Sequence, residues 1–128
     1  MSLSWQTILA IGMGGFLGAV ARAYSVHISN KYIPLEFPVG VLLVNIIGSF
    51  VIGILFAYFA HVTVSDTTKA FLTTGFLGAL TTYSTFAIES YLLLGTSFYL
   101  AVTNMALNLF GTILAAGSGY KLLQFFIK

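Results

Sequence analysis

The sequence contains no cysteine, only two prolines and few charged residues: Lys, Arg, Asp and Glu make up 6% of its 128 residues. The absence of cysteine excludes disulfides and thiolate metal sites. The five basic residues occur singly and the formal charge is only +2. The chain therefore has no basic stripe for nucleic acid and no polybasic lipid-binding patch. A soluble domain carries about 25% charged residues, so this chain lacks the polar surface that a soluble fold needs.

Hydrophobic residues make up 59% of the sequence and occur in long runs. A membrane-spanning helix needs about 20 predominantly apolar residues, and four segments meet this requirement; Arg22 is the only charge in the first. We therefore predict an all-α integral membrane protein that forms a single domain over residues 1–128. Its transmembrane helices are expected at about residues 5–28, 39–60, 70–94 and 97–121.

The segments between these helices are too short to hold a soluble domain, so the function is expected to lie within the membrane. With four alternating spans, Lys69, Lys121 and Lys128 fall on one side and Arg22 and Lys31 on the other. A protein with one fixed orientation usually has a clear excess of Lys and Arg on the cytoplasmic side. The near balance favours dual topology, in which copies insert both ways and form an antiparallel homodimer. The alternative is that so few charges carry no information about orientation.

The third segment mixes glycines with β-branched residues between Gly75 and Thr82, which predicts a helix broken in mid-membrane. Non-helical backbone is tolerated at this depth only where it is buried in protein or lines water, and its freed carbonyls can coordinate a cation. Hydroxyl side chains then surround Tyr83 and Phe86, which lie three residues apart and hence roughly on one face. The positive edge of an aromatic ring can contact an anion; ordinary helix packing is the alternative.

Several polar residues interrupt the other segments. The Asn45 amide, with two donor hydrogens and one acceptor oxygen, can hold an anion or bond to a facing helix. Asn104, Asn108 and Thr112 recur at intervals of four residues and so share one helix face. Such a column suits stepwise passage of a desolvated anion, or it joins two helices as a polar zipper. Arg22 either draws anions into a vestibule or anchors the first helix at the membrane interface.

Three segments carry a family resemblance: GGFLGAVAR at residues 14–22, GVLLVNIIGSF at 40–50, and TGFLGALTTYSTF at 74–86, which continues to Glu89. In this order and spacing they resemble the bacterial fluoride channels of the Fluc/CrcB family, and the similarity covers essentially the whole chain. The third segment is specific, whereas the glycine pairs of the first would mean little alone.

The resemblance implies a passive fluoride-selective channel, not an enzyme, that exports F⁻ across the bacterial cytoplasmic (inner) membrane and lowers fluoride toxicity. It also implies an antiparallel dual-topology homodimer in membrane lipid, with two pores and a structural Na⁺ at the dimer interface. The pore residues it implies are Asn45, Tyr83, Ser84, Thr85, Phe86, Asn104, Asn108 and Thr112. It further implies Arg22 at the vestibule, and the backbone carbonyls of Gly78 and Thr81 as Na⁺ ligands.

The sequence departs from the family pattern at Tyr83, where a phenylalanine is usual, and at Ala79, where a glycine is usual. There are two alternative functions. A small multidrug-type antiporter also has four spans and dual topology, but it needs a carboxylate in its first span, and residues 5–28 contain none. In a non-transporting membrane assembly subunit, the amides would serve only to join helices.

Overall fold

The computed structural model describes residues 2–128, and no strand occurs among them. Three long helices, α1 (Trp5–Tyr32), α2 (Val39–His61) and α6 (Phe98–Ile127), are apolar enough over their length to cross a membrane. Between α2 and α6 lie four shorter elements: α3 (Asp66–Ala70), the π-helix η1 (Phe71–Leu77), α4 (Gly78–Leu80) and α5 (Tyr83–Leu94). The all-α class predicted from composition is confirmed.

Helices α1, α3, α5 and α6 each begin at a hydroxyl residue whose side chain accepts a hydrogen bond from the backbone N–H three residues further on. These N-caps are Ser4, Ser65, Thr82 and Ser97. They pair backbone donors that the helix itself leaves without partners. Two of the helices continue past the spans expected from hydropathy, because α1 ends at Tyr32 and α6 at Ile127.

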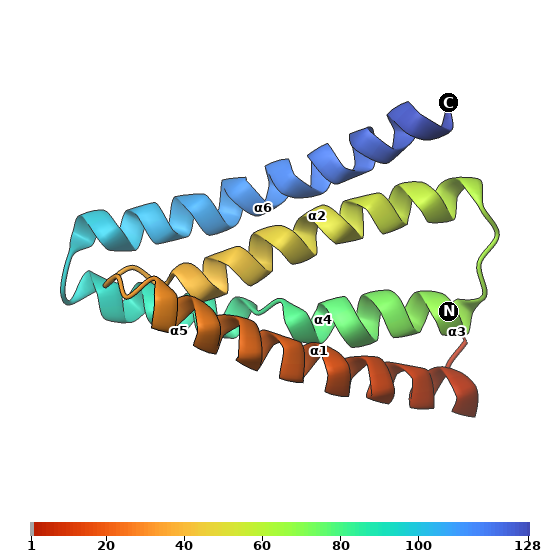
Figure 1. Cartoon of the computed structure of the whole chain (residues 1–128), viewed down its shortest axis with the longest axis horizontal. Helices are drawn as coiled ribbons and strands as arrows, with labels where there is room; N and C mark the ends of the chain where they lie inside the picture. Colours follow the sequence, from red (N-terminus) through yellow and green to blue (C-terminus); the bar gives the residue numbers. More distant parts are fainter. Residues whose placement is uncertain (1) are drawn as a thin grey trace.

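The helices form an elongated bundle (Figure 1). Helix α2 packs along α6, and α1 packs along the line formed by α3, η1 and α4. The N-terminus, the C-terminus and the connection between α2 and α3 lie at one end of the bundle, while the turn between α5 and α6 lies at the other. The two helix pairs contact each other through α1 with α2 and through α5 with α6.

Glycines allow close contact within both helix pairs. A Cβ atom on Gly14 or Gly18 of α1 would overlap carbonyl oxygens of η1, and a Cβ on Gly53 of α2 or Gly119 of α6 would overlap a carbonyl oxygen of the opposite helix. Small residues at these points let backbones approach to van der Waals distance, which is how helices associate in lipid. The close packing of α2 on α6 brings their polar side chains together.

Candidate functional site

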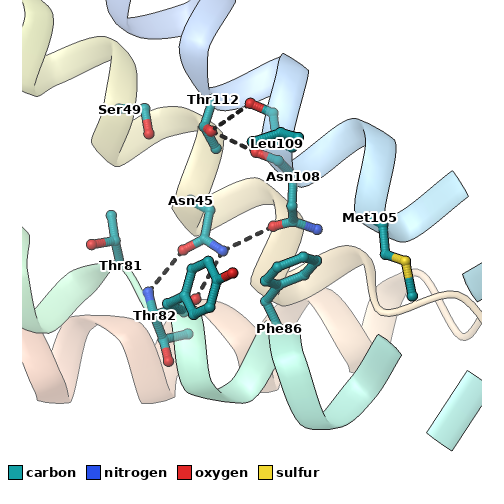
Figure 2. Close-up of a pocket in the computed structure, with 10 residues that line it drawn as sticks. Asn45, Ser49, Thr81, Thr82, Phe86, Met105, Asn108, Leu109 and Thr112 are labelled. Atoms are coloured by element: carbon teal, nitrogen blue, oxygen red, sulfur yellow. Dashed lines mark hydrogen bonds between the residues drawn. The ribbon is translucent and has the colours of Figure 1, made fainter. Parts of the chain in front are cut away.

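Two extended residues, Thr81 and Thr82, separate α4 from α5. Their backbone angles (φ −85° and ψ 158°; φ −150° and ψ 126°) end one helix and begin the next. Asn45 of α2 pairs with the backbone here: the Thr82 N–H donates to its Oδ1 at 2.8 Å, and its Nδ2 donates to the Thr82 carbonyl at 3.0 Å (Figure 2). A side-chain amide thus replaces the helical hydrogen bonds lost at the break, which buried backbone groups require.

The Asn45 amide also joins a chain of buried polar groups that leads into α6. Its Nδ2 donates to Asn108 Oδ1 at 2.9 Å, and Asn108 Nδ2 donates to the backbone and side-chain oxygens of Asn104 at 2.9 and 3.0 Å. Asn104 Nδ2 in turn donates to the Ser90 hydroxyl of α5 at 2.9 Å. All four side chains are buried. The Thr112 hydroxyl donates to the backbone carbonyl of Asn108, one turn further along.

Two aromatic rings lie beside this chain at the start of α5. Tyr83 and Phe86 meet edge to face, with ring centroids 5.4 Å apart and planes at 75°. Phe86 is half-buried, whereas Tyr83 is 80% exposed in the protomer. The edge-to-face contact fixes the rings relative to each other, since the positive edge of one meets the negative face of the other.

The break, the amides and the rings surround one pocket of about 430 Å³. It is lined by Asn45, Ser49, Thr81, Thr82, Tyr83, Phe86, Met105, Asn108, Leu109 and Thr112. None of these side chains carries a charge at neutral pH. Among residues 2–128, no group of three or more His, Cys, Asp and Glu residues lies together as a metal site requires. The pocket offers amides, hydroxyls and ring edges, and no acid–base pair.

Arg22 lies on α1 against the break, well inside the helix. Its Nη1 donates to the Thr81 carbonyl at 3.3 Å, and its side chain is half-buried. The guanidinium therefore sits at the carbonyl end of α4, where a positive charge complements the helix dipole. It does not line the pocket, but it carries the positive charge that contacts the break.

The structure brings together five of the predicted pore residues in the pocket lining: Asn45, Tyr83, Phe86, Asn108 and Thr112. Three others do not line it. Asn104 is turned toward Ser90, the Thr85 hydroxyl accepts from Thr82 Oγ1, and Ser84 is exposed. Sequence reasoning missed Ser90, although Thr82, Phe86 and Ser90 recur every four residues on one face of α5.

The fold and the site define a helical membrane protein with an uncharged polar pocket between its helices, the kind of site that handles a small ion or molecule without covalent chemistry. The sequence matches the family described as CrcB-like protein, Camphor Resistance (CrcB), over residues 9–120. The chain belongs to this family.

Three relatives cover nearly the whole chain, and each is named fluoride-specific ion channel FluC. The protein from Sulfurimonas denitrificans is 55% identical over 98% of this chain and 99% of its own length. One from Campylobacter jejuni is 44% identical over 90% of this chain and 95% of its own. One from Nautilia profundicola is 39% identical over 98% of this chain and 100% of its own.

Proposed function

We propose that this chain is a fluoride-specific ion channel that conducts F⁻ passively out of the cytoplasm and so lowers fluoride toxicity. The observation that carries the proposal is the uncharged pocket at the α4–α5 break, where amides, hydroxyls and ring edges meet in an apolar protein. The full-length relatives named for the same activity support it.

The pocket suits a small, strongly hydrated anion for electrostatic reasons. Fluoride must exchange its water for other hydrogen-bond donors. The amides of Asn45 and Asn108 and the hydroxyl of Thr112 line the pocket and can donate once they turn from their present partners within the protein. The edges of Tyr83 and Phe86 add positive partial charge without competing water. A larger halide gains less from each donor and fits a narrow path less well. Neutral HF enters the cell from an acidified medium and ionises in the cytoplasm. The membrane potential then drives F⁻ outward at about 2.3 kcal/mol per charge per 100 mV.

In the arrangement that we propose, α3, η1, α4 and α5 together form the third of four membrane spans, interrupted at Thr81 and Thr82. Two copies in opposite orientations then form an antiparallel dual-topology dimer in the bacterial inner membrane. The balanced Lys and Arg counts support this arrangement. So do two features of α5: Tyr83 is largely exposed in the protomer, and the buried Oε1 of Glu89 has no hydrogen-bond partner among residues 2–128. A second copy would cover the Tyr83 ring and supply a hydrogen-bond partner for Glu89 Oε1.

A structural Na⁺ at the dimer interface is part of the proposal, with the carbonyls of Gly78 and Thr81 as its ligands. Broken membrane helices offer carbonyl oxygens to Na⁺, and the Gly78 carbonyl fits this role. The Thr81 carbonyl accepts from Arg22 Nη1, so the guanidinium would have to move aside for Na⁺ to bind that oxygen. Within the described residues, the Thr82 N–H donates to Asn45, although in a continuous helix it would donate to the Gly78 carbonyl. One protomer supplies too few oxygens, so the second copy would complete the set. Bound there, Na⁺ would supply positive charge near the pocket.

The remaining predicted residues take indirect roles in this proposal. Arg22 contacts the break and not the pocket lining, so it acts as a vestibule charge that raises the local fluoride concentration. Thr85 and Ser84 belong to the first turn of α5, where Thr85 binds the Thr82 cap. Thr85 thereby helps to fix the direction in which α5 presents its rings.

The direct test is fluoride release from liposomes that contain the purified chain and are loaded with potassium fluoride, followed with a fluoride-selective electrode after valinomycin is added. We expect rapid release that depends on valinomycin, because a passive channel needs a counter-ion path. Asn45→Asp replaces the donor with a negative charge and should abolish release while the dimer persists. Release no faster than from empty liposomes would refute the proposal and favour an assembly subunit.

A further inference from the structure

In the structure, every amide hydrogen of the two pocket asparagines is already engaged. Asn45 Nδ2 donates to the Thr82 carbonyl and to Asn108 Oδ1, and Asn108 Nδ2 donates to two oxygens of Asn104. An amide nitrogen carries two hydrogens, so neither side chain has one free for an anion. What Asn108 directs toward Asn45 is its oxygen, an acceptor, which repels an anion.

A half-turn of the Asn108 amide would reverse this pattern. The oxygen and the nitrogen of an amide exchange places with little change in shape. After the turn, Nδ2 of Asn108 faces Asn45, and the Asn45 N–H that had donated to Asn108 Oδ1 loses its acceptor. One N–H group of Asn45 and one of Asn108 then point to the same part of the pocket. An anion there would accept from both of them.

Asn108 cannot turn alone, because its oxygen would then face the backbone and side-chain oxygens of Asn104 and leave buried acceptors unpaired. Asn104 is 1% exposed, and beyond it lies the Ser90 hydroxyl. If Asn104 turns as well, its Nδ2 donates to Asn108 Oδ1 and its oxygen accepts from Ser90. A hydroxyl can donate or accept by rotation, so the side-chain bonds along the chain reverse and keep a partner. The bond from Asn108 Nδ2 to the Asn104 backbone carbonyl is lost, and the two N–H contacts to the anion must offset that loss.

We infer that Ser90 and Asn104 are positioning residues for the anion site, and that Ser90, Asn104 and Asn108 form a relay that reverses when fluoride binds. The reversal converts the pocket from an acceptor site to a donor site. The inference rests on the proposed fluoride function and deepens it. It gives Asn104 a role different from the direct fluoride contact implied by the family resemblance, because Asn104 lies outside the pocket lining.

The first test is Asn104→Leu, which keeps the approximate shape but removes the donor that the turned Asn108 oxygen needs. The resting state keeps the bond from Asn108 Nδ2 to the backbone carbonyl of residue 104, so the variant favours the resting orientation. We expect the fluoride concentration for half-maximal flux to rise about tenfold. The fluoride-induced rise in melting temperature in detergent should weaken in parallel. Thr103→Val, which removes a hydroxyl bonded to its own helix backbone, is the matched control and should leave both quantities unchanged.

The second test repeats the substitution in an Asn108→Ser background. A serine hydroxyl rotates freely and needs no relay, so Asn104→Leu should then change the half-maximal concentration by less than about twofold. A merely structural defect would instead persist in that background. Asn104→Ala removes the same donor with a smaller side chain and should reproduce the Asn104→Leu effect, which covers the case in which Asn104→Leu fails to fold. Ser90→Ala removes the partner of Asn104 in both orientations, so it should lower the melting temperature and change the half-maximal concentration by less than about twofold.

The outcomes separate the relay from the proposed function. If the wild type conducts fluoride and neither Asn104→Leu nor Asn104→Ala changes the half-maximal concentration, the relay is overturned and the channel stands. The same holds if Asn104→Leu has an equal effect with and without Asn108→Ser. A wild type without fluoride flux would overturn both.

Discussion

Replacing Asn45 with leucine should weaken the protein at the α4–α5 break, because one side chain there makes three hydrogen bonds. The bonds join it to the Thr82 N–H at 2.8 Å, the Thr82 carbonyl at 3.0 Å and Asn108 Oδ1 at 2.9 Å. Leucine has a similar shape and no polar atoms. Asn45→Leu therefore removes three bonds and leaves three buried groups without their partners.

The expected loss follows from the value of hydrogen bonds between membrane helices. Each contributes about 0.6 kcal/mol on average and up to about 1.7, so three give a loss of about 2–5 kcal/mol. Each buried unpaired group in a water-soluble protein would cost about 1–3 kcal/mol. The membrane range is the relevant one, since the unfolded helices in a membrane also find partners.

The assay is equilibrium unfolding of the purified chain in mixed micelles as the fraction of dodecyl sulfate is raised. Ser49→Ala is the matched control, because Ser49 lies one turn further along α2, lines the same pocket and takes no part in the Asn45 bonds. We expect the control to change the free energy of unfolding by less than about 0.5 kcal/mol. A change of that small size for Asn45→Leu as well would contradict the assignment of Asn45 as the residue that holds the break.

Further predictions concern packing, charge and the rings. Gly53→Ala should destabilise the chain by about 1–3 kcal/mol, because the added Cβ would overlap the backbone of α6. Gly117→Ala is the control, since there is open space around its Cβ. Equal free energies of unfolding for the two variants would contradict this packing. Arg22→Gln should lower fluoride flux at low ionic strength. The difference from wild type should shrink in high salt, because salt screens the charge of Arg22, and Arg22→Lys should keep nearly the wild-type flux. A difference that does not depend on salt would mean that Arg22 only holds Thr81 in place. Tyr83→Phe should retain fluoride release because the ring edge remains, whereas Tyr83→Leu should reduce it; equal release from both would remove the ring from the anion path.

The membrane character and the helical class could be predicted from the sequence because they depend on composition and run length. Helix ends were less predictable: α1 and α6 continue past the apolar stretches, as backbone hydrogen bonding does not stop where hydropathy falls. The π-helix η1 was not expected. Its backbone lies against Gly14 and Gly18 of α1, and that contact between distant segments leaves no periodic signal in the sequence.

The hydrogen-bond partners of the candidate site were also not predictable from the sequence. Spacing placed Asn104, Asn108 and Thr112 on one helix face, but it could not say which of their hydrogens are free. That depends on Ser90 of α5 and Asn45 of α2, which contact them only in the folded chain. Arg22, likewise, was expected near the end of a span, and its contact with Thr81 becomes visible only when α1 is laid against α4.

The central claim is that fluoride crosses this protein alone and passively, and the reversal potential across a planar bilayer tests it most directly. The bilayer separates solutions that differ tenfold in fluoride concentration and have equal chloride concentrations. The current through a fluoride-selective channel should then reverse near the fluoride equilibrium potential, about 59 mV. Inverting the gradient should invert the sign. A reversal potential near zero, set by the equal chloride concentrations, would contradict the account.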